Sequence, residues 1–279
     1  MPRVEQRANR FGVLLRPLAD AFEDEVVRAE VLHLLRGIGE SLGLRGDDLE
    51  QLPCAVRRVV TSDNPCSESV LRRWIFDRTS QSSIEVQLEE RAKLIRSQVA
   101  PYVCGPRLAD VGCGDGLVAQ GFKHLGDVTL LDVVNYVAPT VDLPFVSYSG
   151  QGPLPLEQAV DCSLLLTVLH HSEDPIALLH GVFEATRRRV IVIESVVPDE
   201  DSDTFERQFL VAALFDWFYN RILHEDVPVP FNYNSVHGWT QQVERCGWTV
   251  SVTKDFGRDQ PLVPERHVLF VLDRPSSFA

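Results

Sequence analysis

The chain has 279 residues, of which 44% are hydrophobic and 24% are charged, a balance typical of a folded globular protein and not of a disordered one. It carries a net charge of −13 from 27 Lys and Arg against 40 Asp and Glu. Residues 1–100 hold 15 basic and 16 acidic residues, so residues 101–279 carry −12 of this charge. A negatively charged protein repels the phosphate backbones of nucleic acids, and we therefore do not expect nucleic acid as the substrate.

Several targeting and metal-binding classes are also disfavoured. No uninterrupted apolar run reaches the roughly 18 residues that a membrane helix needs. The first residues, Met-Pro-Arg-Val-Glu-Gln-Arg, lack the apolar run of a secretion signal. The six cysteines form no CxxC pair and match no common zinc or disulfide framework. We expect a cytoplasmic protein without a membrane segment or a resident metal, and a homodimer is compatible with the sequence.

Residues 1–100 are predicted to form a helical cap, because their apolar residues recur at helical spacing without a strong strand pattern. Gly37 and Pro53 are expected to end the first two helices. We expect helices over the ranges 11–35, 49–52, 67–76 and 84–99.

From Arg107 onward, short apolar runs of strand length alternate with helical segments. Continuous apolar strands are typical of a parallel sheet that helices cover on both faces. The first five runs are 108–111, 128–132, 145–148, 162–168 and 190–194. Two further runs, 248–253 and 267–272, flank a turn-rich loop and are expected to pair antiparallel at the end of the sheet. The chain is therefore predicted to be an α/β protein with a doubly wound sheet.

The most informative segment follows the first predicted strand. Asp110 precedes three glycines in the pattern G-x-G-x-G, at Gly112, Gly114 and Gly116, and a helical stretch comes next. A doubly wound sheet binds ligands at this position, where glycines let the backbone turn sharply and approach a ligand closely. Asp132 ends the second strand, 20 residues after Gly112. A carboxylate there can accept hydrogen bonds from both ribose hydroxyls of a nucleoside.

Two alternatives compete with a nucleoside site of this kind. The first is a dinucleotide site, whose fingerprint G-x-G-x-x-G places its third glycine one residue later than this loop does. Asp110 would also repel a pyrophosphate, whereas it would suit a cationic amino group. The glycines could also make a tight turn and nothing more. The order of strand, acid, glycines, helix and second acid favours a ligand with an amino acid end and a ribose end.

These residues resemble the class I S-adenosylmethionine-dependent methyltransferases over roughly residues 85–272. Asp110-Val-Gly-Cys-Gly-Asp-Gly116 looks like the first motif of that family, and Asp132 like its ribose-binding acid. The stretch from Asp161 to Pro175, with Thr167 inside it, looks like the fourth motif of the UbiE-like small-molecule branch. The resemblance implies a Rossmann-like seven-stranded doubly wound sheet over 101–279, S-adenosylmethionine as cofactor, a helical cap over 1–100 and a substrate insertion around 198–240.

The same resemblance suggests groups near the reacting centre. His170 and His171 follow the fourth strand, and one of them is a candidate general base, the alternative being that they support the loop or contact the cofactor. Asn135 and Tyr136 follow Asp132 and are candidates for lining the adenosine or the reacting centre. We expect Thr167 to contact the cofactor. The family's frequent adenine-binding Asp is missing, because the third strand is followed by Ser-Tyr-Ser-Gly-Gln.

Further candidates lie in the cap and in the insertion. Arg78 is expected to pair with the cofactor carboxylate and Trp74 to face the sulfonium or substrate, although a solvated surface role competes for the arginine. Phe231, Tyr233 and Asn234 lie in a predicted loop of the insertion and are expected to line an acceptor pocket for a small molecule.

The sequence leaves three functions open. The first is methyl transfer from S-adenosylmethionine to a small molecule. The second is cyclisation of S-adenosylmethionine itself with release of methylthioadenosine, as in the azetidine-2-carboxylate synthases that resemble this family. The third is a scaffold that binds the cofactor without catalysis.

Overall fold

A computed structural model describes residues 16–62, 64, 66–79, 81–224, 227–258 and 263–275. The predicted start of the first helix, from Phe11 to Leu15, lies outside this range. The chain divides into two compact units. The first lies within Met1–Glu85, Glu200–Phe231 and Gln260–Pro264, and the second within Val86–Asp199, Asn232–Asp259 and Glu265–Ala279.

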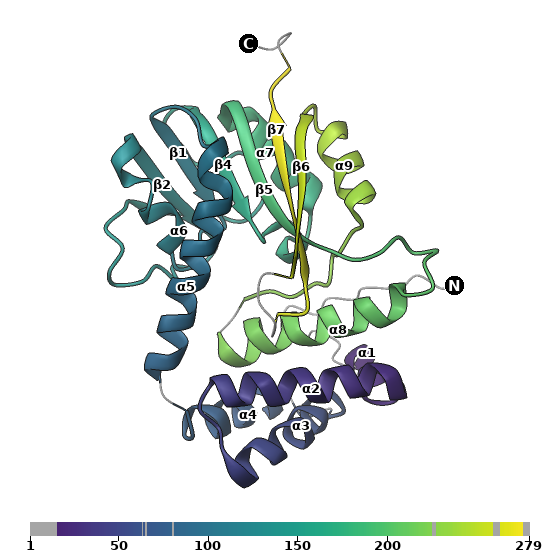
Figure 1. The fold of residues 1–279 in the computed structure, drawn as a ribbon. Helices are drawn as coiled ribbons and strands as arrows, with labels where there is room; N and C mark the ends of the chain where they lie inside the picture. Colours follow the sequence, from purple (N-terminus) through teal and green to yellow (C-terminus); the bar gives the residue numbers. More distant parts are fainter. Residues whose placement is uncertain are drawn as a thin grey trace. The chain divides into compact units, whose positions relative to one another are not determined.

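The first unit is helical in its described part, as the apolar spacing predicts. α2 and α8 run alongside each other in it (Figure 1). Its elements are α1 (Arg16–Ala19), a 3-10 turn (Asp20–Phe22), α2 (Glu25–Ser41), α3 (Gly46–Val60), α4 (Ser67–Phe76), the start of α5 (Gln81–Val99), and α8 (Phe205–Trp217), which continues into a π-helix (Phe218–Leu223).

Two predicted helix ends in this unit are wrong. α2 continues through Gly37 to Ser41, and α3 contains Pro53 instead of stopping there. Isolated helices would lose about 1 kcal/mol at such a glycine and about 3 kcal/mol at such a proline. Both helices present a continuous apolar face, with Ile38 and Val56 among its fully buried residues, and the burial of that face offsets the local loss.

Polar contacts fasten α4 to the π-helix. The Glu68 carboxylate accepts hydrogen bonds from the Trp217 indole Nε1 at 2.7 Å and from Arg221 Nη2 at 2.8 Å. Arg72 donates to the backbone carbonyls of Arg221, Ile222 and His224, where the π-helix ends. Arg72 thus supplies donors at a helix end, where the hydrogen bonds within a helix run out.

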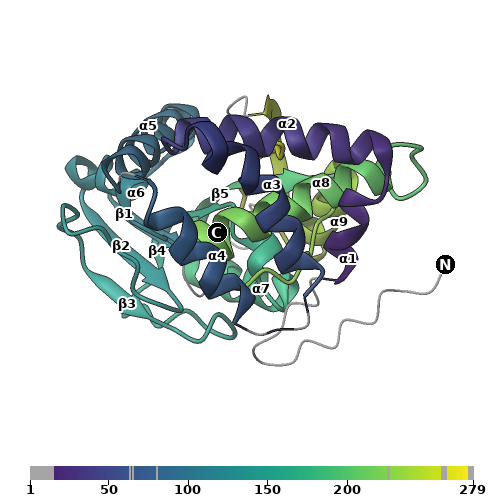
Figure 2. The ribbon, with the colours of Figure 1, turned by 90° about the horizontal axis from the view of Figure 1, so that it is seen from below.

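The second unit contains a seven-stranded sheet in the order β3-β2-β1-β4-β5-β7-β6. Figure 2 shows β3, β2, β1 and β4 side by side in this order. The first five strands pair parallel, and β7 and β6 pair antiparallel at the end, which confirms the expected pattern. The strands are β1 (Arg107–Val111), β2 (Asp127–Asp132), β3 (Phe145–Ser147), β4 (Val160–Leu166), β5 (Thr186–Val196), β6 (Thr249–Arg258) and β7 (Arg266–Asp273).

Helices cover both faces of this sheet, which explains its continuous apolar strands. Residues of α5 and of α6 (Leu117–Gln120) pack in one cluster with β1, β2 and β4. Residues of α7 (Pro175–Ala185) and of α9 (Val236–Arg245) pack on the other face. Short 3-10 turns at Ala100–Tyr102, Lys123–Leu125 and Leu169–His171 complete the unit. Within the described part of the chain, no helix has the length and apolar content needed to cross a membrane.

Candidate functional site

The glycine loop turns the chain sharply at the carboxyl end of β1. Gly112, Gly114 and Gly116 all have left-handed backbones, with φ of 72°, 52° and 73°. A Cβ on Gly112 would lie 2.6 Å from the Val168 side chain, whereas a Cβ on Gly114 would meet nothing within 4 Å. The first glycine is therefore required by packing against the loop after β4. The second leaves open space above its backbone, where a ligand can approach.

Asp132 joins this loop to the neighbouring strand. Its Oδ2 accepts a hydrogen bond from Gly114 N at 2.9 Å, and its Oδ1 accepts one from Val133 N at 2.7 Å. Burial raises the pKa of this carboxyl, while the backbone N–H donors act in the opposite direction. An ionised carboxylate has about four acceptor sites, so it can hold both N–H groups and still accept hydroxyl donors from a ligand.

Asp110 lies beneath the loop near the end of β1 and is only 2% exposed. Burial, reinforced by the charges of Asp115 and Asp132, raises the pKa of this carboxyl to about 8. The charges of Asp115 and Asp132, with that of Asp110 when it is ionised, disfavour a phosphate and favour a cation. A positively charged group bound beside them would shift Asp110 back towards its ionised form.

A second bend lies at the end of β4. Thr167 has φ of 60°, a left-handed conformation that costs a β-branched residue about 1–3 kcal/mol. The surrounding chain holds it there, because its backbone N–H donates to the Ile193 carbonyl at 2.6 Å. The loop that follows packs against the glycine loop, because Val168 lies against Gly112.

Glu194 of β5 organises this second loop, and sequence analysis missed it. Its side chain is fully buried. Oε1 accepts hydrogen bonds from Val168 N at 2.8 Å and Leu169 N at 2.6 Å, and Oε2 lies 2.6 Å from His170 Nδ1. An acid that closes a run of β-branched residues, beside a parallel strand followed by two histidines, is the signal that could have identified it.

The histidines and one insertion residue lie together in the second unit. The His170 and His171 rings are 4.1 Å apart between centroids, and the Tyr233 ring stacks on His170 at 5.5 Å. His170 is buried, whereas His171 is half-buried. Asn234 is tied to the end of β5, since its backbone carbonyl accepts a hydrogen bond from Val197 N at 3.1 Å.

Asn135 and Tyr136 belong to the segment that follows β2. The Asn135 side chain accepts a hydrogen bond from Val137 N at 3.1 Å and so forms a local turn. The segment is joined to the glycine loop by a bond from Ala138 N to the Asp115 carbonyl at 2.9 Å. The structure therefore brings this segment beside the loop, and the catalytic roles assigned to both residues stay predictions.

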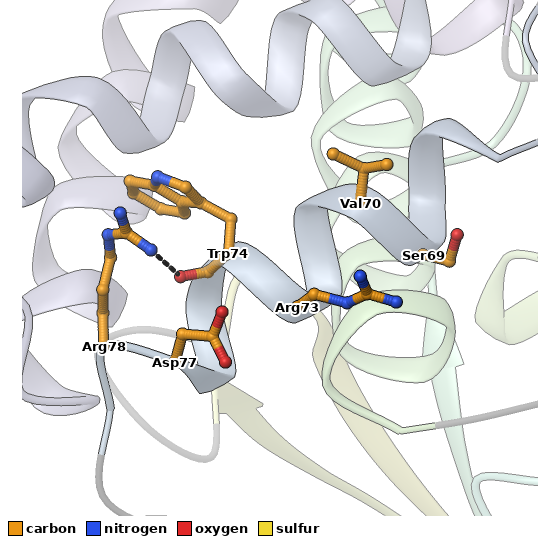
Figure 3. A pocket seen from close by; sticks show the side chains of 6 residues that line it. All are labelled: Ser69, Val70, Arg73, Trp74, Asp77 and Arg78. Atoms are coloured by element: carbon orange, nitrogen blue, oxygen red, sulfur yellow. Dashed lines mark hydrogen bonds between the residues drawn. The ribbon is translucent and has the colours of Figure 1, made fainter.

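Trp74, Arg78 and Phe231 belong to the first unit. Arg78 folds back over the Trp74 ring, with Cζ 4.9 Å from the ring centroid (Figure 3). It donates to the Trp74 carbonyl and to Asp48 Oδ1, each at 3.0 Å. Trp74 and Arg78 line a pocket of about 250 Å³ together with Ser69, Val70, Arg73 and Asp77. Phe231 has a left-handed backbone with φ of 59°.

Several of the solved structures that resemble this chain are named as methyltransferases. A protein assigned as a methyltransferase, in complex with the Trm112 methyltransferase activator of Haloferax volcanii, gives a TM-score of 0.50 at 13% identity over 69% of this chain and 94% of its own. One from Bacillus halodurans C-125 gives 0.49 at 12% identity over 67% of this chain and 99% of its own. Magnesium protoporphyrin IX methyltransferase of Synechocystis PCC 6803, with bound S-adenosylhomocysteine, gives a TM-score of 0.47 at 12% identity. The match covers 80% of this chain and 94% of the enzyme's own.

No protein-family model and no curated protein matches the chain by sequence. The likeness to the Haloferax structure, together with the strand order, shows a Rossmann-like methyltransferase fold with a helical N-terminal region. At 13% identity this likeness establishes the fold alone.

Replacement of the first two loop glycines is expected to separate packing from backbone strain. Gly112→Ala should lower the free energy of unfolding by about 3 kcal/mol, because strain and the Val168 contact add. Gly114→Ala should lower the free energy of unfolding by about 1 kcal/mol, since only the backbone is strained. Chemical denaturation measures both values, and equal losses would contradict the packing role of Gly112.

Glu194→Gln is expected to destabilise the protein by about 2–4 kcal/mol, because an amide cannot accept three hydrogen bonds from the loop after β4. Glu184→Gln is the matched control, since Glu184 is an exposed carboxylate on α7. It should change the free energy of unfolding by less than about 0.5 kcal/mol. A neutral result for Glu194→Gln would show that the buried carboxylate does not hold this loop.

Proposed function

We propose that this chain is an S-adenosylmethionine-dependent enzyme that methylates a small molecule. The observation that carries the proposal is the pair formed by the left-handed glycine loop and Asp132, which Gly114 N joins at 2.9 Å. The open space at Gly114 and the acceptor sites of Asp132 match a nucleoside with an amino acid tail. The Haloferax structure, which is similar in fold, is assigned as a methyltransferase.

The residues of the second unit fit such a cofactor. Asp132 would accept the ribose hydroxyls, and the backbone of the glycine loop would receive the amino acid tail. The buried Asp110 would favour the cationic amino group of that tail, which a phosphate ligand lacks. S-adenosylmethionine, when bound, supplies an electrophilic methyl group on a sulfonium. The chain must then align an acceptor with it and exclude water.

We assign different roles to the two histidines. His170 is buried and held through Nδ1 by Glu194, which also takes the N–H groups of Val168 and Leu169. Its role is therefore to fix the loop and to support its neighbour. His171 is more accessible, and we propose it as the general base that takes the proton from an acceptor hydroxyl or amine. Tyr233, which stacks on His170, would line the acceptor side together with Asn234.

The histidine segment supports a place in the UbiE-like small-molecule branch, on the motif from Asp161 to Pro175. The negative charge of residues 101–279 supports a small acceptor over a nucleic acid. Thr167, which has a strained backbone at the start of the loop after β4, would contact the cofactor through its backbone or hydroxyl. Asn135 and Tyr136, on the segment joined to the glycine loop, would lie near the adenosine.

Binding of S-adenosylmethionine by the purified full chain tests the cofactor site. Asp132→Asn is expected to weaken the affinity about 10- to 100-fold, because a charged acceptor of two hydroxyls is lost. Asp127→Asn, at the exposed opposite end of the same strand, should leave the affinity unchanged. Calorimetry measures both dissociation constants. Absence of binding, or equal affinities of the two variants, would refute the site.

The released nucleoside then distinguishes the reactions. Incubated with S-adenosylmethionine alone, the protein is expected to leave it intact, and S-adenosylhomocysteine should form only when an acceptor is added. Mass spectrometry identifies the product. Methylthioadenosine formed without an acceptor would instead support cyclisation of the cofactor.

His171→Ala is expected to lower kcat about 10²- to 10⁴-fold with little change in S-adenosylmethionine affinity, because the base is lost and the cofactor residues remain. His180→Ala, an exposed histidine on α7, is the control and should retain full turnover. Steady-state kinetics with an acceptor found by screening give both values. Full activity of His171→Ala would mean that alignment alone suffices.

A further inference from the structure

Two cysteines of the second unit meet where β1 and β4 begin. Cys104 lies in the segment that leads into β1 and is partly exposed, whereas Cys162 is fully buried in β4. Cys104 packs against the apolar cluster that contains Cys162.

The backbone around the two thiols is held in place. Cys162 pairs with Leu108 in the β1–β4 register. Arg107 N donates to Asp161 Oδ2 at 3.1 Å, which draws the segment before β1 against the start of β4. A Cβ on Gly105 would lie 2.3 Å from that of Asp161, so the two segments are in close contact beside Cys104. The two chain segments that carry the thiols are therefore neighbours.

The surroundings distinguish the two sulfur atoms. The hydrogen bond from Cys162, helped by the charges of Arg188 and Arg189, lowers the pKa of Cys104 to about 6 against the effect of burial. Arg189 is fixed near it, because Nη1 donates to the Tyr102 carbonyl at 3.1 Å. The hydrogen bond to Cys104 and burial raise the pKa of Cys162. A partly exposed thiolate beside a buried thiol is the arrangement of an attacking and a resolving cysteine.

We propose that Cys104 and Cys162 form a redox-active dithiol that a small hydroperoxide, such as hydrogen peroxide, converts reversibly to a disulfide. The Cys104 sulfur attacks one peroxide oxygen, the O–O bond breaks, and the departing hydroxide takes up a proton as water. The Cys162 sulfur then attacks the sulfenic acid of Cys104, and the hydroxyl leaves with the Cys162 proton as a second water. Two thiols are oxidised to one disulfide, and the peroxide is reduced to two water molecules.

The dithiol lies at the amino ends of β1 and β4, whereas the glycine loop and Asp132 lie at the carboxyl ends of the strands. The inference therefore does not depend on the proposed methyl transfer. Oxidation would join the chain leading into β1 to β4.

Peptide mapping of the full chain tests the disulfide, because complete trypsin cleavage places each of the six cysteines on a different peptide. After brief exposure to hydrogen peroxide and blocking of the remaining thiols, peptide 97–107 should be found linked to peptide 124–187, and dithiothreitol should separate them. The exposed Cys54 and Cys66 serve as internal controls for unselective oxidation. A different major link, or Cys104 still reduced when Cys54 and Cys66 are oxidised, would overturn the proposal.

The alkylation rate of Cys104, followed on peptide 97–107, tests the pairing in a second way. Cys162→Ala should slow this alkylation about tenfold at pH 7 and move its pH midpoint upward from near 6, because the donor to the thiolate is lost. Cys162→Ser keeps a donor and should retain most of the rate. Cys246→Ala, at a buried thiol elsewhere, should change nothing. An unchanged rate in Cys162→Ala would overturn the proposed pair.

Discussion

The bond between the Asp132 carboxylate and the Gly114 N–H is the interaction on which the candidate site depends. It joins the loop after β1 to the end of β2. It can form only because Gly112, Gly114 and Gly116 adopt left-handed backbones that other residues avoid. The bond fixes an acidic side chain beside an open stretch of backbone. We propose that these two features receive a nucleoside diol and an amino acid tail.

The loop after β4 is held by a different kind of contact. The fully buried Glu194 collects the N–H groups of Val168 and Leu169 and the Nδ1 of His170. A buried carboxylate is tolerable only when such donors surround it. Val168, positioned in this way, occupies the space that a side chain at Gly112 would need. The two loops are therefore coupled by packing. Thr167, whose left-handed backbone is strained, lies where they meet.

Local sequence patterns predicted most elements of the second unit, because strands buried on both faces are apolar throughout and their loops are rich in glycine. They failed at Gly37 and Pro53, where packing of a helix face outweighed local helix preference. The helical stretch predicted after Gly116 is short, since α6 stops at Gln120 and a 3-10 turn follows. Each error concerns a residue whose conformation depends on partners distant in the chain.

The sequence by itself determined the order of strands and helices along the chain, the glycine loop and the acid that ends the second strand. These features depend on short-range periodicity and on backbone freedom. Only the tertiary structure decided that Glu194 holds His170, that Tyr233 stacks on that ring, and that Cys104 packs against the cluster that contains Cys162. Parallel strands pair residues many positions apart, so no local pattern encodes which side chains will share a sheet edge.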